Sequence, residues 1–410
     1  GTTYLRRRNV KAELLTGINT TSLVFKFAKN NLLINRLPVD FSGDMAILKD
    51  GYDIDLKVVS GTTEFGNIFS ALPPDYDDWL AGTRFSGTSQ IRVEMNGGYR
   101  AATGQAPDLS VSLWVHDGLI QYKQAPAPLQ HFRINTTVIL PGLNPDSLIF
   151  KLDTLGFDLN GASTHAEIYM KGIQEPYIRA NLNSNLDLAM LDQALGLSVA
   201  ELRGQFKLKG EVDGFYRTGQ NPDRWRADTV ITSIPRFNLE ADIENGYLKY
   251  SDLPLALENI GLKLLSSCKT GKPDDINVAV QHLQASVGKG SLSGGLELSG
   301  LNNNRVKASL KADLQLDDLS KAIPLSDFAL GGKLTADVQT EGLMDAEKNR
   351  FPATHGNILL QNGRIQTPYY PHPIEQLEIK SEIECGNGKL EDLSIRVSPF
   401  AFVFEQQPFS

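Results

Sequence analysis

Long stretches of this chain alternate strictly between apolar and polar residues. From Val306 to Leu316, every even-numbered position holds Val, Ala or Leu, and every odd-numbered position holds a polar residue. Residues 178–182, 205–209 and 334–338 follow the same pattern. Successive side chains of a β-strand point to opposite faces, so each stretch predicts a strand with one apolar and one polar face. Such strands are typical of antiparallel sheets, because parallel sheets are buried on both faces.

A second pattern is a motif that occurs three times. A strand-like segment leads to Asp117-Gly118, to Asn245-Gly246 or to Asn362-Gly363, and each dipeptide is followed by a short apolar stretch and then by proline. The three glycines lie 128 and 117 residues apart. Asp-Gly and Asn-Gly favour the type I′ turn, in which both central residues take positive φ. We therefore predict a β-hairpin turn at each of the three sites.

The segments between these motifs repeat as well, which predicts an array of similar units. Residues 187–195 form a short helix-like run, and residues 316–323 form its counterpart in the next unit. We expect residues 1–105 to be the back half of one unit, 106–226 and 227–350 to be the next two units, and 351–410 to begin another. Because the chain enters and leaves in mid-repeat, we expect a piece of a longer, quasi-one-dimensional protein.

The apolar faces of such strands must be covered, and two architectures achieve this. A unit of about 120 residues has room for roughly eight to ten strands. These strands form either a closed sandwich in each unit or part of a long curled sheet with an apolar groove inside. We predict a mainly β, antiparallel, elongated repeat array that forms a curled-sheet groove, with a few short helices. Tandem β-sandwiches are the alternative that periodicity leaves open.

Composition narrows the function classes. The net charge is −8, and the basic run Arg6–Arg8 is short, so we expect no nucleic-acid partner. No stretch reaches the roughly eighteen apolar residues that a membrane helix needs, and no signal peptide is recognisable.

The two cysteines occupy equivalent positions of successive repeats. Cys268 and Cys385 each follow a motif glycine by 22 residues, and the first repeat has Leu140 at that place. A position that accepts Leu or Cys is most simply a packing position. We therefore expect structural thiols rather than a disulfide, which would require the two units to stack at that point.

Patterns that would indicate catalysis are missing. The six histidines are scattered and form no metal-ligand spacing. The segment Gly288–Gly294 departs from the phosphate-loop order, and no Gly-x-Ser-x-Gly elbow occurs. Asp117 is replaced by Asn245 and Asn362 in the other repeats, which suits a turn and not an acid–base role. We expect a non-enzymatic protein without catalytic residues, cofactor or metal.

The repeated signature resembles the C-terminal region of AsmA-like proteins, which are bacterial envelope proteins related to TamB and YhdP. The match lies in residues 113–138, 241–264 and 358–383, and the segments between them support it across most of the chain. The resemblance implies a β-rich groove in the periplasm, anchored to the inner membrane through parts absent from this chain. It also implies phospholipid transport or outer-membrane assembly between the two membranes, with envelope proteins as further partners.

The resemblance agrees with the alternating pattern, because a one-faced sheet offers a continuous apolar lining for acyl chains. The rival hypothesis is a structural or adhesive array of closed sandwiches that binds a protein partner. We expect charged substitutions at Leu310 or Leu314 to block lipid passage while the sheet still folds. The residues expected to line the groove are Ile178, Leu182, Phe206, Leu208, Leu310, Leu314, Leu316, Leu334 and Val338.

Overall fold

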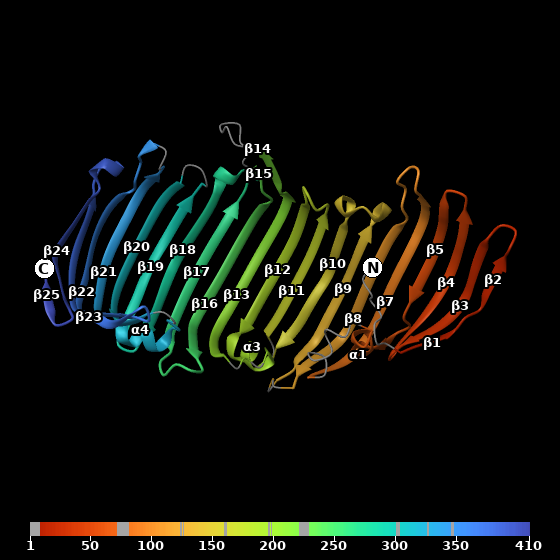
Figure 1. Ribbon diagram of the computed structural model, residues 1–410, viewed down its shortest axis with the longest axis horizontal. Coiled ribbons are helices and arrows are strands. Elements are labelled where there is room, and N and C mark those ends of the chain that lie inside the picture. The colour runs from red at the N-terminus through yellow and green to blue at the C-terminus, as the bar shows by residue number, and fades with distance from the viewer. Residues whose placement is uncertain are drawn as a thin grey trace. The chain divides into compact units, whose positions relative to one another are not determined.

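The chain folds into two compact units. The computed structural model describes residues 9–71, 82–123, 125, 127–159, 162–195, 197, 199–220, 229–300, 304–325, 328–345 and 348–410. The first unit comprises Gly1–Ser184, Gln193–Gly196 and Val212–Val230. The second comprises Asn185–Asp192, Leu197–Glu211 and Ile231–Ser410. Both consist almost entirely of antiparallel strands (Figure 1).

The first unit is a meander in which each strand pairs with the next. From β3 to β12 all the pairs are antiparallel, and each strand pairs with the next one in the chain. The two-residue β6 is passed over, so that β5 pairs with β7. Both β1 and β2 pair with β3. The strands are β1 (Val10–Glu13), β2 (Thr16–Asn19), β3 (Val24–Ile34), β4 (Leu37–Leu48), β5 (Gly51–Val59), β6 (Thr63–Glu64), β7 (Thr83–Arg100), β8 (Asp108–Tyr122), β9 (Leu129–Leu140), β10 (Ile149–Leu159), β11 (Ala162–Lys171) and β12 (Tyr177–Asp187).

The second unit is built in the same way, and every strand from β16 to β25 pairs with its successor. Its strands are β16 (Arg236–Tyr250), β17 (Leu257–Cys268), β18 (Ile276–Val287), β19 (Gly290–Ser299), β20 (Asn304–Gln315), β21 (Ala329–Met344), β22 (Ala353–Thr367), β23 (Tyr370–Cys385), β24 (Ser394–Phe404) and β25 (Gln407–Phe409). The remaining strands are β13 (Ala200–Phe215), β14 (Arg217–Gln220) and β15 (Thr229–Ser233).

Helices are short. The α-helices are α1 (Phe65–Phe69), α3 (Leu188–Leu195) and α4 (Leu316–Ala322). Single 3₁₀ turns occupy η2 (Pro141–Leu143), η3 (Pro145–Ser147), η4 (Pro273–Asp275) and η6 (Leu390–Asp392). The two helix-like runs that the sequence indicates, 187–195 and 316–323, are thus confirmed to within a residue.

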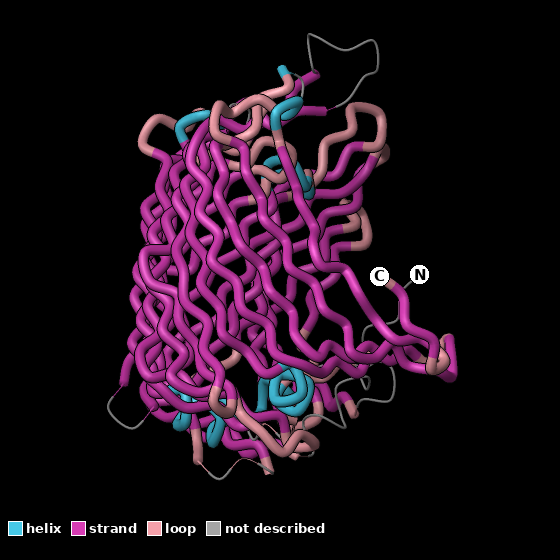
Figure 2. Tube along the Cα trace, turned by 90° about the vertical axis from the view of Figure 1, so that its left-hand side faces the viewer, coloured by secondary structure: helices cyan, strands magenta, loops and turns pink. Residues whose placement is uncertain are grey.

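The strands of each unit form one open, curled sheet. Among the described residues, the first and last strands of a unit do not pair with each other, and the only other sheet is the two-stranded β14–β15. Figure 2, in which the C-terminal part of the chain faces the viewer, shows the strands of the second unit curving. The predicted antiparallel curled sheet is confirmed. The alternative of tandem sandwiches is wrong for the part of the chain that the structure describes.

The predicted hairpin turns are also wrong. The three Asp/Asn-Gly motifs lie inside β8, β16 and β22, which are 15 residues long each. Asp117, Asn245 and Asn362 have φ values of 50°, 52° and 48°, and the pairing register shifts at each of them. The motif is therefore a β-bulge. Asp and Asn tolerate positive φ better than most residues, so a bulge selects the same residues as a type I′ turn.

Each bulge changes which sequence positions face which side of the sheet. In β22, Ile358 and Leu360 lie on the same face as Gly363 and Ile365, so this face passes from even to odd positions at Asn362. The neighbouring strand carries a matching positive-φ residue 14 positions later in all three repeats, at His131, Asn259 and Gln376. Because both strands shift together, the apolar face stays continuous across the bulge.

The two cysteines are free, fully buried packing residues. The Cys268 thiol donates to the Lys272 carbonyl oxygen at 3.3 Å, and the Cys385 thiol donates to the Lys389 carbonyl oxygen at 3.4 Å. Each cysteine thus anchors the loop that follows its strand. The expectation of structural thiols is confirmed.

Candidate functional site: the apolar face of the sheet

The pairing register collects the apolar positions of neighbouring strands on one face. Leu310 of β20 lies opposite Gly294 of β19 and Val338 of β21. Antiparallel partners share a face, so the rows run on from strand to strand. We call this side of the second unit the apolar face. On β19 to β22 it comprises Leu292, Leu296, Leu298, Val306, Ala308, Leu310, Ala312, Leu314, Leu334, Ala336, Val338, Ile358 and Leu360.

The charged residues of these four strands all lie on the opposite, polar face. Lys311 and Asp337 are opposite each other in the register, with Nζ 3.5 Å from the carboxylate oxygen. Two further pairs flank them: Lys333 lies 3.2 Å from Asp313 and Lys307 lies 3.8 Å from Glu341. Exposed pairs of this kind contribute at most about 1 kcal/mol each. Their main effect is to keep the polar face hydrated and the register defined.

Two pKa shifts on the polar face have the same origin. A hydrogen bond to Glu240, at 3.1 Å, raises the pKa of Lys263. The pKa of Glu382 is lowered, first by the hydrogen bond from Lys380 at 2.8 Å and further by the charges of Lys380 and Arg396. Cross-strand and same-strand ion pairs therefore favour the charged forms on this side of the sheet.

The middle of the apolar face has no covering layer among the described residues. The elements that contact β20 extensively are its two neighbouring strands and α4. Leu310 is 40% exposed, and the surrounding Leu296, Ala308, Val338 and Ile358 are half-buried. Side chains on the inner side of a curled sheet converge and shield one another, which accounts for partial burial without a second layer.

One end of the apolar face is closed by α4. Val287, Leu314 and Ala322 are at most 9% exposed and form a core with Leu319 of the helix. The helix is held there by hydrogen bonds: Gly332 N donates to Asp317 at 3.0 Å, and the Ser320 hydroxyl donates to the Leu330 carbonyl oxygen at 3.1 Å. We call this the helix end of the face. The opposite end, where residues 269–275 and 386–393 connect the strands, is the loop end (Figure 1).

The first unit has an apolar face of the same kind. Ile178 of β12 lies opposite Met170, and Leu182 lies opposite Ala166. The helix α1 closes one end, where Phe65 is 3% exposed and its ring lies 5.0–5.8 Å from three others, those of Phe69, Phe85 and Phe132. This aromatic cluster is not apparent from the sequence, because only Phe65 and Phe69 are close together in the chain.

The structure places eight of the nine predicted lining residues on strands, and one of these eight is covered. Phe206 and Leu208 are half-buried between exposed polar neighbours on β13, as alternation requires. Leu314 lies under α4, so it is a core residue and not an open lining residue. Leu316 is not a strand residue, because it is the first residue of α4. The other five, Ile178, Leu182, Leu310, Leu334 and Val338, face the apolar side.

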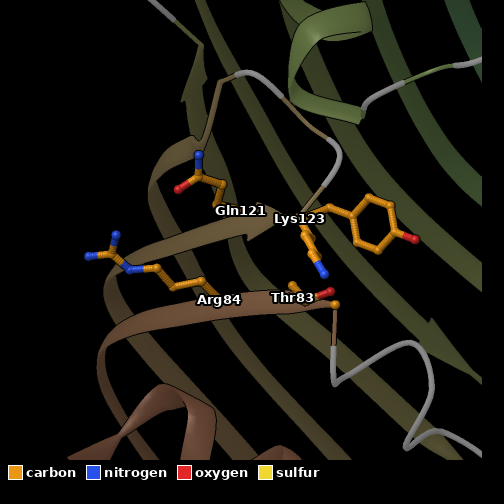
Figure 3. Close-up of a pocket in the computed structure, with 6 residues that line it drawn as sticks. Thr83, Arg84, Gln121 and Lys123 are labelled. Atoms are coloured by element: carbon orange, nitrogen blue, oxygen red, sulfur yellow. The ribbon is translucent and has the colours of Figure 1, made fainter.

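A hollow of about 310 Å³ lies where β7 begins and β8 ends. Two cationic side chains, Arg84 and Lys123, line this hollow, but they do not converge. Figure 3 shows Arg84 and Gln121 pointing to one side of the strand pair, and Thr83 and Lys123 to the other. Arg84 and Gln121 are opposite each other in the register, as are Thr83 and Tyr122. The hollow therefore has no single wall of charge that could hold an anion.

Among the described residues, no group of three or more His, Cys, Asp or Glu residues is arranged to hold a metal ion. Nor does any described helix combine the length and the apolar character needed to cross a membrane.

Comparison with known proteins places the chain in no family. No family model, no curated protein and no solved structure matches it.

Proposed function

We propose that this chain is a non-enzymatic lipid-binding protein whose apolar sheet face holds acyl chains of phospholipid. The observation that carries the proposal is the uncovered middle of the apolar face around Leu310. Soluble proteins rarely leave extended apolar surface open unless something binds there. An acyl chain suits the site because its binding needs apolar area and no specific polar contact.

The energetics support a mobile occupant. Burying one methylene is worth about 0.8 kcal/mol, so a chain of roughly fourteen methylenes that is half covered gains about 6 kcal/mol. Much of this is offset by the loss of chain freedom on binding. The balance permits loading and release, and no row of the face differs enough from its neighbours to trap the chain at one strand.

The resemblance to AsmA-like proteins extends the proposal to a setting. We propose a bacterial periplasmic location and a role in moving phospholipid between the inner and outer membranes, or in outer-membrane assembly. The repeated units suit this role because successive strands present the same apolar rows.

Lipid analysis of the purified chain tests the proposal. The protein is expressed in bacteria, purified without detergent, extracted and analysed by mass spectrometry for phospholipid per mole of protein. We expect at least one phospholipid per chain. A β-rich protein of similar size, purified identically, gives the background. A well-folded chain that carries no more lipid than this control, and takes up none from vesicles, would contradict the proposal.

A further inference from the structure

We propose that the acyl chain lies along the strands, with its methyl end at the helix end and its polar group at the loop end of the apolar face. This inference rests on the proposed function and adds an orientation to it. The alternative is an acyl chain that lies perpendicular to the strands and crosses several of them. Three features of the second unit favour the first arrangement.

The two ends of the face differ in chemistry. On the face itself the helix end is closed by apolar packing, because Val287 and Leu314 pack there against Ala322 of α4, and the charged Lys321 and Asp318 of this helix pair with each other. The loop end continues into residues 269–275 and 386–393, which carry exposed charged side chains of both signs, among them Lys272 and Lys389. These loops are anchored by the buried thiols described above. An amphiphile matches this gradient in only one direction.

Polar groups on the face itself also gather toward the loop end. Thr340 of β21 and Thr354 of β22 lie on the apolar face beyond Val338, and their hydroxyl oxygens are 2.8 Å apart. Between them and the helix end, β20 and β21 present only Leu, Ala and Val to this face. A lipid lying across the strands would place its polar group over these apolar rows, where no partner compensates its lost hydration.

The length of the open stretch fits an acyl chain. Val306 and Ala312 bound the part of β20 beyond the α4 core, and six residue steps span about 20 Å at about 3.4 Å per residue. One leaflet of a bilayer has a hydrocarbon depth of about 15 Å, half of the 30 Å core. A chain whose methyl end meets α4 at Ala312 therefore spans about four residue steps and brings its polar group level with Ala308, which pairs with Thr340 on the loop-end side of Val338.

Depth-dependent fluorescence quenching tests the orientation. Trp79, Trp114 and Trp225 are replaced by Phe, and one tryptophan is introduced by Leu360→Trp near the helix end or by Leu298→Trp near the loop end. Each protein is loaded with phosphatidylcholine brominated at carbons 6 and 7 or at carbons 11 and 12. We expect the deeper bromines to quench Leu360→Trp at least twofold more strongly, and the shallower bromines to quench Leu298→Trp more strongly.

The possible outcomes separate this inference from the function on which it rests. Bound lipid with equal or reversed quenching preferences at the two positions overturns the orientation and leaves lipid binding intact. Absence of both quenching and bound lipid overturns lipid binding itself, and the orientation with it. If circular dichroism shows that a variant has lost its β-sheet signal, Leu334→Trp and Val306→Trp provide the equivalent pair on the adjacent strands.

Discussion

Leu310 and Lys311 are neighbours in the chain, yet they belong to two different environments. The Lys311 side chain is exposed to water and forms an ion pair with Asp337. Leu310 is part of the uncovered apolar surface and is 40% exposed. The polar face needs no further cover, because its side chains are hydrated and Lys307, Lys311 and Lys333 each have an acidic partner. The apolar face is complete only at the helix end, where α4 covers Leu314. Its open middle is where a ligand would act.

The largest expected effect on the free energy of unfolding is at the part of the apolar face that α4 covers. Leu314→Asp places a carboxylate in the core beneath α4, and we expect a loss of about 3–5 kcal/mol in the free energy of unfolding. Leu310→Asp, four residues away on the same face, should cost only about 1 kcal/mol because Leu310 is already partly hydrated. Urea titrations followed by circular dichroism measure both values. Equal losses would show that the two positions share one environment.

The next effect concerns the bulge that keeps the two faces continuous. Asn362 has a φ of 48°, which is unfavourable for a β-branched residue. We expect Asn362→Val to lower the free energy of unfolding by about 1–2 kcal/mol, and Asn362→Gly to leave it within about 0.5 kcal/mol of the original. The same titration checks the pair. A destabilising glycine would mean that the side chain, and not the backbone conformation, matters at this position.

A smaller effect is expected from the ion pairs of the polar face. Lys311→Ala removes the partner of Asp337, and exposed pairs are worth up to about 1 kcal/mol. The loss should shrink as salt is added, because the charges are screened. Unfolding measured at low and high salt tests this. A loss that does not depend on salt would assign the effect to packing of the lysine side chain.

The smallest effect is the pH dependence of the same face. Lys380 and Arg396 lower the pKa of Glu382 in the folded sheet, so its ionised form stabilises the fold. That contribution is present at neutral pH and disappears as the pH falls through the lowered pKa. We expect Glu382→Gln to show a weaker decline in stability on acidification than the original chain. Parallel pH profiles for the two proteins would argue against a role for this carboxylate.

Alternation along the chain was sufficient to predict the two faces, and it failed where the answer depends on distant residues. Leu316 fits both the alternating pattern and the helix-like run 316–323, and in the structure it is the first residue of α4. Alternation places Leu314 on the apolar face, but its cover comes from Val287 and Ala322 on other elements.

The Asp/Asn-Gly motifs failed for a different reason. Asn362 needs positive φ in a bulge as it would in a hairpin turn, so local preference does not distinguish the two. Only the pairing of β22 with β23 on both sides of the motif shows that the strand continues. The repeat was thus recognisable from its sequence, whereas the role of its most conspicuous residues depended on long-range pairing.

The central claim is that acyl chains bind the apolar face and not the polar one. The most direct measurement compares Leu310→Asp with Ser309→Asp, which adds the same charge one residue away on the opposite face. Bound phospholipid per folded chain is determined for both by mass spectrometry, with circular dichroism confirming the fold. We predict that Leu310→Asp loses most of its lipid while Ser309→Asp retains it. Equal lipid content in the two variants would contradict the claim.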